Sequence, residues 1–200
     1  MLGTIIGDIV GSRFEFRNHR SKDFELFTPA CDFTDDSICT IAVADALLNE
    51  GDFTEYIHRW CRRYPNPMGS YGGRFAQWVA SDHPRPYGSF GNGSAMRVSP
   101  CGYLNPLEDV LRQAEASAVC SHDHPEGVRG AQIVAHSIWA LRHGATKSDI
   151  IQIAEETYGY SVKNLRVEDL QRSNRFDETC QGTIPPALCC FLESIDFEDA

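Results

Sequence analysis

The sequence has 200 residues, of which 42% are hydrophobic and 23% are charged, and its formal net charge is −10 at pH 7. This composition suits one globular domain, and the negative charge disfavours nucleic acid or an anionic membrane as the main partner, because phosphate binding needs clustered lysine and arginine side chains. No apolar run approaches the roughly 20 residues that cross a bilayer, and no basic signal-peptide start is present, so we expect a cytoplasmic protein whose eight cysteines are reduced.

The first distinctive segment, residues 7–15, is Gly-Asp-Ile-Val-Gly-Ser-Arg-Phe-Glu. Its glycines do not form the Gly-x-Gly-x-x-Gly pattern of dinucleotide-binding proteins, and no strand-like segment of useful length precedes them. Two interpretations remain open from the residues alone. Gly7 and Gly11 would allow close packing of two helices, or the acidic residues of the segment have a functional role.

Residues 38–48 carry apolar side chains at steps of three and four residues, which is typical of a helix that faces a core. The stripe runs through Ile38, Ile41, Ala42, Ala44 and Leu48, with the acidic Asp45 on the same face. Asp52 is expected to be the N-cap of the next helix, with Glu55 three residues later. That helix should end before Pro65, since the residue before a proline disfavours helical geometry.

Four further helices are expected along the rest of the chain, and they define the fold class. Apolar periodicity and a proline at a permitted first-turn position predict helices at residues 106–119 and 125–141. Shorter patterns predict a helix at 148–158, capped by Ser148, and another at 185–192 that would begin with a proline. Because strand-like alternation of useful length is absent, the sequence predicts an all-α protein.

Residues 33–37, Phe-Thr-Asp-Asp-Ser, are candidates for both capping and metal binding. Oxygen-bearing side chains before an apolar helix are usually caps, but capping needs only one of them. The adjacent carboxylates of Asp35 and Asp36 repel each other, and a hard divalent cation would relieve that repulsion. An all-oxygen ligand set suits Mg²⁺ or Mn²⁺ better than zinc, which prefers cysteine and histidine.

Residues 87–97, Tyr-Gly-Ser-Phe-Gly-Asn-Gly-Ser-Ala-Met-Arg, form a glycine-rich segment. Gly91 and Gly93 would let the backbone approach a ligand, and their N–H groups can face phosphate oxygens. Phe90 or Tyr87 could stack on a base. The alternative is a tight turn before a helix, for which an Asn-Gly pair is the usual signal.

Residues 120–126, Cys-Ser-His-Asp-His-Pro-Glu, invite comparison with a metal site. A zinc site needs about four nitrogen or sulfur ligands, and no second pair with matching spacing exists elsewhere in the chain. We therefore expect His122 to contact a substrate or to support a group that does. His124 is expected to begin the helix that follows.

The last residues, Asp196-Phe197-Glu198-Asp199, repeat the acidic start of the helix at Asp52-Phe53-Thr54-Glu55. A helix start without its helix is unstable, because helix nucleation is costly. We therefore expect a chain that is shortened relative to the sequence that shaped it. A frayed tail on a complete protein is the alternative.

In this order, the segments resemble the ADP-ribosylglycohydrolase family, which includes bacterial dinitrogenase-reductase-activating glycohydrolases and animal ADP-ribosylhydrolases. The resemblance rests on Gly7-Asp8-x-x-Gly11-Ser12 with Glu15, on Thr34-Asp35-Asp36-Ser37, on Gly91 to Arg97, on Ser121-His122 with Pro125-Glu126, and on Cys180-Gln181-Gly182-Thr183-Ile184-Pro185-Pro186-Ala187. It implies one ADP-ribosylglycohydrolase-like domain over residues 1–200, folded as an orthogonal multi-helix bundle.

The resemblance also implies a cleft that holds two Mg²⁺ ions, for which Mn²⁺ could substitute. The implied metal ligands are Thr34, Asp35 and Asp36. The implied catalytic residues are Glu15, Asp35 and Asp36. The implied ADP-ribose contacts are Phe90, Gly91, Asn92, Gly93, Ser94 and His122. Family members carry a later Gly-Gly-Asp-x-Asp-Thr-type segment that completes the metal site, and these 200 residues contain none, so the bundle is expected to be incomplete at its C-terminal end.

The expected reaction is Mg²⁺-dependent cleavage of the glycosidic bond between ADP-ribose and a protein side chain or small acceptor. Nucleic acid would enter only as a modified substrate. Two alternatives stay open: a catalytically impaired, truncated ADP-ribose-binding homologue, and a structural relative of the crystallin-like type. The acceptor would be chosen by loops at residues 65–73 and 82–88.

Overall fold

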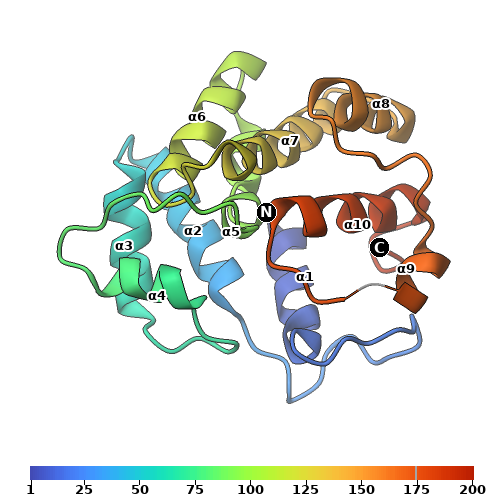
Figure 1. Cartoon of the computed structure of the whole chain (residues 1–200), viewed down its shortest axis with the longest axis horizontal. Helices are drawn as coiled ribbons and strands as arrows, with labels where there is room; N and C mark the ends of the chain where they lie inside the picture. The colour runs from blue at the N-terminus through green and yellow to red at the C-terminus, as the bar shows by residue number, and fades with distance from the viewer. Residues whose placement is uncertain (174) are drawn as a thin grey trace.

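The computed structural model describes residues 1–173 and 175–200, and within them it contains ten α-helices, two 3₁₀ turns, one π-helical turn and no β-strand. The all-α prediction is therefore confirmed. The helices run in different directions, and in Figure 1 α10 lies across the view whereas α1 runs along it. The helices are α1 (Leu2–Gly11), α2 (Asp35–Leu48), α3 (Phe53–Arg63), α4 (Gly73–Ala80), α5 (Gly93–Met96), α6 (Leu107–Val119), α7 (Pro125–Arg142), α8 (Lys147–Gln152), α9 (Val167–Ser173) and α10 (Cys180–Glu193).

Side-chain caps fix the starts of several helices, as the sequence predicts. The Thr34 side chain accepts a hydrogen bond from the backbone N–H of Asp36 at the start of α2. Asp52 does the same for α3, and α3 ends before Pro65. His124 is the N-cap of α7, which confirms its predicted role at the start of that helix.

The buried face of α2 differs from the predicted stripe. Ile38 and Ala42 are buried as expected, but Ile41 and Leu48 are exposed. The side chains buried in their place include Cys39, Val43 and Ala46. The reason is that α2 packs against α1, α3, α5 and the 3₁₀ turn Ser99–Tyr103, so that more than one of its faces is covered.

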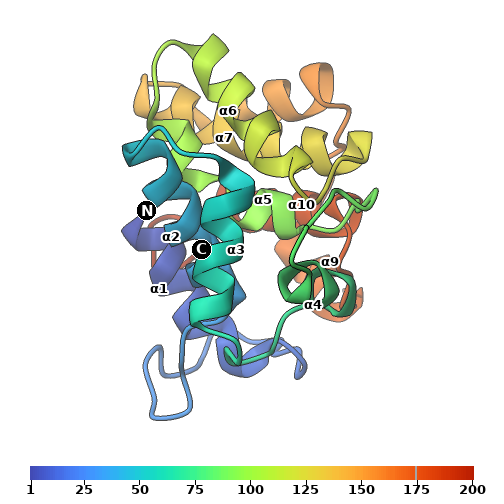
Figure 2. The same cartoon turned by 90° about the vertical axis from the view of Figure 1, so that its left-hand side faces the viewer.

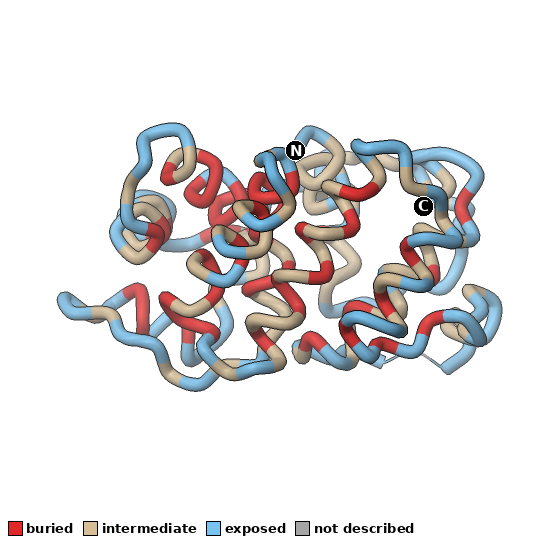
Figure 3. Tube along the Cα trace, turned by 90° about the horizontal axis from the view of Figure 1, so that it is seen from above, coloured by how far each residue is buried: buried red, intermediate tan, exposed pale blue. Residues whose placement is uncertain are grey.

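Helix α7 joins two hydrophobic clusters. Ala131 and Ala135 belong to the cluster built with α2, α3 and α6, whereas Ile133 belongs to the cluster built with α10 and the segment at residues 154–162. Helix α5, short as it is, packs against α2, α6 and α7 at the centre of the molecule (Figure 2). The exposed residues gather in the loops at the rim (Figure 3).

The start of α8 lies two residues earlier than predicted. Thr146, rather than Ser148, is the N-cap, and it forms a reciprocal capping box with Asp149. A capping box satisfies two backbone donors at once, and this outweighs the single acceptor that a serine offers. The predicted continuation is a π-helical turn from Ile153 to Thr157.

Helix α10 begins well before the predicted 185–192 segment. Its N-cap is Thr179, whose side chain accepts a hydrogen bond from the backbone N–H of Gly182. Pro185 and Pro186 therefore lie inside the helix, where proline is normally disfavoured. The prediction placed proline at a first turn because that is its usual helical position. Helices α4 and α9 were not predicted.

The close helix packing inferred from Gly7 and Gly11 is wrong. Among the described residues, nothing lies within 4 Å of a Cβ added at either glycine once the helix's own nearby backbone and the chain neighbours are set aside. Gly130 in α7 does permit close packing, between α7 and α10. A Cβ there would lie 2.4 Å from Cys180 Sγ and 3.0 Å from Ile184 Cδ1, both in α10.

Replacing Gly130 by alanine is therefore expected to lower the free energy of unfolding by about 1–3 kcal/mol, the usual cost of overpacking a core. Gly7→Ala is the matched control, because its methyl group would meet no neighbour and alanine favours a helix by up to about 1 kcal/mol over glycine. Urea denaturation of both variants measures the difference. Equal stability of Gly130→Ala and the parent protein would show that α7 and α10 are not in close contact.

The predicted helix start near the end of the chain is a turn. The backbone N–H of Asp199 donates to the Asp196 carboxylate at 2.9 Å, and the ring of Phe197 lies beside Gly3 of α1.

In the part of the chain that the structure describes, none of the helices combines the length and the apolar character that crossing a membrane requires.

Candidate functional site

A cavity of about 950 Å³ lies where segments distant in the sequence meet. One wall comes from α1 and the turn after it, through residues 4–16, and from the start of α2 at residues 34–36. The opposite wall comes from residues 69–75 and 87–97. His122, Phe176 and Glu178 complete it. Gly7 and Gly11 face this cavity, so their lack of side chains leaves space for a ligand rather than for a helix.

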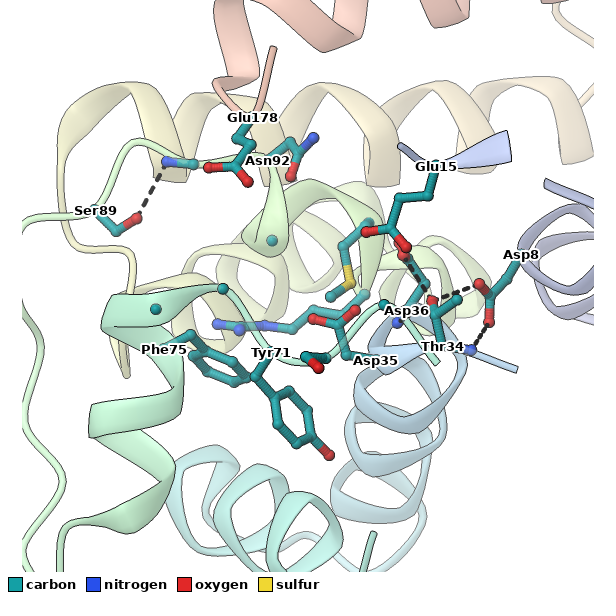
Figure 4. A pocket seen from close by; sticks show the side chains of 18 of the residues that line it. Asp8, Glu15, Thr34, Asp35, Asp36, Tyr71, Phe75, Ser89, Asn92 and Glu178 are labelled. Carbon is teal, nitrogen blue, oxygen red and sulfur yellow. Dashed lines mark hydrogen bonds between the residues drawn. The ribbon is translucent and has the colours of Figure 1, made fainter. Parts of the chain in front are cut away.

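Asp8 ties α1 to the start of α2 (Figure 4). Its Oδ2 atom accepts hydrogen bonds from the backbone N–H of Thr34 at 2.9 Å and of Ser37 at 3.2 Å. The hydroxyl groups of both residues also donate to this carboxylate, that of Thr34 at 2.5 Å from Oδ1. Four donors on one carboxylate fix the segment that carries Asp35 and Asp36.

Asp35 and Asp36 are partly buried at this junction. Burial, together with repulsion from Asp36 and Glu15, raises the pKa of Asp35 to about 8. Burial and the charge of Asp8 raise the pKa of Asp36 to about 6, against the lowering effect of its hydrogen bond with Thr34. Thr34 confirms the capping interpretation of the segment, and its cap leaves both carboxylates available for another partner.

Glu15 follows the 3₁₀ turn Ser12–Phe14 and points towards the same acids (Figure 4). Its pKa is raised by burial and by the charges of Asp36, Asp8 and Glu178. Its Oε2 atom is buried and has no hydrogen-bond partner among the described residues. A Cβ at Gly69 would lie 2.1 Å from that atom, and the φ of +78° at Gly69 also favours glycine.

The side-chain oxygen atoms of Thr34, Asp35 and Asp36 suit a hard divalent cation. Carboxylates that crowd one another are stabilised either by protons or by a cation, and the unpartnered oxygen of Glu15 is an open ligand or base. Across the described residues, no three histidine, cysteine, aspartate or glutamate side chains come close enough to form a metal site by themselves. These residues therefore provide part of a metal site: the carboxylates of Asp35 and Asp36 and the hydroxyl of Thr34, with water as the further oxygen ligand.

The glycine-rich segment forms the wall opposite the acids. Gly91 makes an isolated antiparallel bridge with Thr179, and the backbone N–H of Asn92 donates to the carbonyl of Glu178 at 2.7 Å. Gly93 begins α5, and a Cβ there would lie 2.9 Å from His122 Nε2. Glycine at this position is what lets the imidazole reach the cavity wall.

The structure separates the substrate-binding residues implied by the family resemblance into two groups. Gly91, Asn92, Gly93 and His122 are among the described residues that line the cavity, and Phe90 and Ser94 are not. Ser94 is fully buried, and its hydroxyl donates to the carbonyl of Gly127 at 2.7 Å. Phe90 is 44% exposed, and its ring packs edge-on against His124.

Several cavity residues were not selected from the sequence. They include Asp8, Arg74, Tyr71, Phe75 and Glu178, whereas Tyr87, a predicted candidate for stacking on a base, also lines the cavity. Arg74 donates to the carbonyl of Tyr87, and its guanidinium lies 4.8 Å from the centre of that ring. Asp8 belongs to the motif at residues 7–12, but no role was predicted for it. The glycine-rich stretch at residues 69–73 was the signal for a second ligand-facing loop.

Together these features define an all-α protein with a cleft in which carboxylates face a glycine-rich loop. The sequence model of the ADP-ribosylglycohydrolase family matches residues 1–200, and the chain belongs to that family. The confirmed fold is the orthogonal helical bundle implied by the resemblance. A solved structure described as an ADP-ribosylglycohydrolase-related protein complex superposes with a TM-score of 0.72 at 20% identity, over 99% of this chain and 75% of that one.

Named relatives are 23–26% identical to this chain. The ADP-ribosylhydrolase ARH3 of Xenopus tropicalis is 23% identical over 98% of this chain and 73% of its own length. The ADP-ribosylarginine hydrolase Tri1 of Pseudomonas putida is 25% identical over 100% of this chain and 62% of its own length. Human ARH3 is 26% identical over 74% of this chain and 50% of its own length. The match thus spans only part of each relative.

Proposed function

We propose that this chain forms the site of a divalent-cation-dependent ADP-ribosylhydrolase. The observation that carries the proposal is that one cavity brings Glu15, Asp35 and Asp36 face to face with the glycine loop at residues 91–93. The relatives are named for hydrolysis of ADP-ribose conjugates, and two of them, ARH3 and Tri1, are similar along the whole chain. The substrate class would be an ADP-ribosylated protein or a small ADP-ribose conjugate.

Thr34, Asp35 and Asp36 would hold Mg²⁺ or Mn²⁺. All three contribute oxygen atoms, as these cations prefer, and the buried, unpartnered Oε2 atom of Glu15 adds negative charge nearby. The family resemblance implies two ions in the complete site. The bound cation would supply polarisation of ribose hydroxyls and of a water molecule.

The bond to be broken determines what the residues must do. Departure of the group at the anomeric carbon builds positive oxocarbenium character on the ribose, which nearby carboxylates stabilise. Glu15 would accept a proton from the attacking water, and a carboxyl whose pKa is raised is a better base than an ordinary one. The glycine loop and His122 would hold the diphosphate, which keeps the reacting carbon before Glu15.

A paired assay tests the proposal. The 200-residue chain is incubated with an ADP-ribosyl-arginine peptide or an ADP-ribosyl-serine peptide and Mg²⁺, and released ADP-ribose is quantified by chromatography. Calorimetry with ADP-ribose and Mg²⁺ is run in parallel. Release that stops on addition of EDTA supports the hydrolase. Binding without release contradicts turnover and favours the ADP-ribose-binding alternative. Absence of both contradicts an ADP-ribose site.

Asp8 is expected to support the site without touching the ligand. Asp8→Asn removes the charge that holds the Thr34 and Ser37 donors, so the start of α2 loses its fixed position. Loss of such a supporting carboxylate typically weakens metal affinity about 10–100-fold, and we expect Mg²⁺-dependent ADP-ribose binding to fall by this amount. Asp32→Asn is the control, since that exposed side chain accepts a hydrogen bond from the backbone N–H of its own neighbour, Phe33. Equal losses in both variants, measured by calorimetry, would contradict a specific role for Asp8.

A further inference from the structure

A chain of buried hydrogen bonds leads from the core to the cavity wall. Arg97 is fully buried, and its Nη2 atom donates to Ser121 Oγ at 2.9 Å. Ser121, also fully buried, lies with its Oγ 2.8 Å from His122 Nδ1. The other ring nitrogen of His122, Nε2, faces the glycine loop. These three residues are hydrogen-bonded in series, and Arg97 and His122 both line the cavity.

The direction of each bond follows from the donors present. Arginine can only donate, so Ser121 Oγ accepts from Arg97 and must direct its own proton elsewhere. Two acceptors are near that hydroxyl: His122 Nδ1 at 2.8 Å and Cys120 Sγ at 3.9 Å. The nitrogen is much closer and is the stronger acceptor. Nδ1 therefore accepts, and the proton of a neutral imidazole lies on Nε2.

The ring is neutral in this environment. Burial is the main cause that lowers the pKa of His122 well below its usual value, and the positive charges of Arg97 and Arg74 lower it further. Nε2 has no hydrogen-bond partner among the described residues. A Cβ at Gly93 would lie 2.9 Å from it and one at Gly91 3.5 Å, so only glycines keep the space before it open.

Arg97 is held through its Nη2 atom, while its Nε and Nη1 atoms have no hydrogen-bond partner among the described residues. Its Nη2 donates to the carbonyl of Ser117 at 2.7 Å, in the last turn of α6, where the helix dipole places partial negative charge. Its guanidinium also lies 5.9 Å from the centre of the Phe75 ring. A cation fixed at a helix end in this way holds the Ser121 hydroxyl in one orientation.

We infer that Arg97 is a positioning residue, which acts through Ser121 to hold His122 in the Nε2–H tautomer. His122 thereby presents one fixed, neutral N–H donor beside the glycine loop, suited to an anionic oxygen of a ligand. In the proposed function, on which only this last step rests, that oxygen belongs to the diphosphate of ADP-ribose.

The test measures the tautomer directly in the ligand-free protein. Long-range ¹H–¹⁵N NMR spectra distinguish the two neutral tautomers, and His122→Gln assigns the ring signals. The parent protein is expected to show the Nε2–H form, and Ser121→Ala a mixture with a substantial Nδ1–H fraction. Ser137→Ala is the matched control, because it also removes a buried serine hydroxyl but one far along α7 and without a hydrogen-bond partner among the described residues. Ser121→Thr keeps the hydroxyl and should restore the parent spectrum.

Calorimetry with ADP-ribose then tests the ligand step. Ser121→Ala is expected to weaken binding about fivefold to tenfold, the effect of one misplaced hydrogen bond, and Ser137→Ala to leave it unchanged. An Nδ1–H tautomer in the parent protein, or an unchanged tautomer in Ser121→Ala, would overturn the inference. Failure of the parent to bind ADP-ribose would instead overturn the proposed function and the ligand step, while the NMR result would still decide whether the Ser121 hydroxyl, held by Arg97, fixes the tautomer of His122.

Discussion

Asparagine in place of Asp35 or Asp36 is expected to lower the rate of ADP-ribose release by on the order of 1,000-fold, since a bound cation contributes several kcal/mol to such a reaction. Each substitution removes one of two carboxylates in the proposed ligand set and leaves the volume of the side chain almost unchanged. Mg²⁺-dependent binding of ADP-ribose should fall with it. Chromatography of released ADP-ribose at saturating Mg²⁺ measures the effect.

Unfolding is not expected to explain that loss. Burial and repulsion from neighbouring acids raise the pKa of both carboxyls, so a neutral amide is less unfavourable there than a carboxylate in the metal-free protein. The melting temperature of each variant in EDTA should equal or exceed that of the parent. Asp52→Asn is the control, because asparagine caps a helix as well as aspartate does. Full activity of Asp35→Asn and Asp36→Asn would show that these carboxylates do not bind a cation that the reaction needs.

Replacing Glu15 by glutamine is also expected to have a large effect. The kcat should fall about 100- to 1,000-fold because the general base is lost. KM should change little, because Glu15 lies by the acids rather than by the glycine loop that would hold the diphosphate (Figure 4). Steady-state kinetics with an ADP-ribosyl peptide separate the two parameters. Glu108→Gln, in the first turn of α6 and exposed, is the matched control.

The result that contradicts this role is equally specific. A rise in KM at constant kcat would make Glu15 a binding residue instead of a base. Its buried Oε2 atom, which has no partner within the described residues, would then have to meet the ligand itself.

The parts of the structure that depend on neighbouring residues were predictable from the sequence. Caps at Asp52 and His124 use hydrogen bonds that span two or three residues, and both were predicted as helix starts. The cap at Thr34 lies within the predicted capping segment at residues 33–37, in which no single residue was selected. The acidic pair was also visible, because two adjacent carboxylates exceed what one cap requires. The all-α class followed from periodicity along the longer helices.

The parts that depend on tertiary packing were not predictable in the same way. The role of Asp8 appears only when α1 is placed beside the start of α2, a separation of 26 residues in sequence between Asp8 and Thr34. The buried face of α2 differs from the predicted stripe because four other elements pack against this helix. Arg97 was quoted in a motif, yet its contact with Ser121 depends on how α5 packs against α6 and α7.

The central claim is that oxygen atoms of Thr34, Asp35 and Asp36 hold a divalent cation in the cavity shared with the glycine loop. Crystals grown with Mn²⁺ and ADP-ribose test it most directly, because manganese gives anomalous diffraction and prefers the same ligands as magnesium. We expect an anomalous peak bonded to Asp35 or Asp36, with the diphosphate beside Gly91 and Gly93. A saturated crystal without a peak at these residues, or with ADP-ribose bound elsewhere, would contradict it.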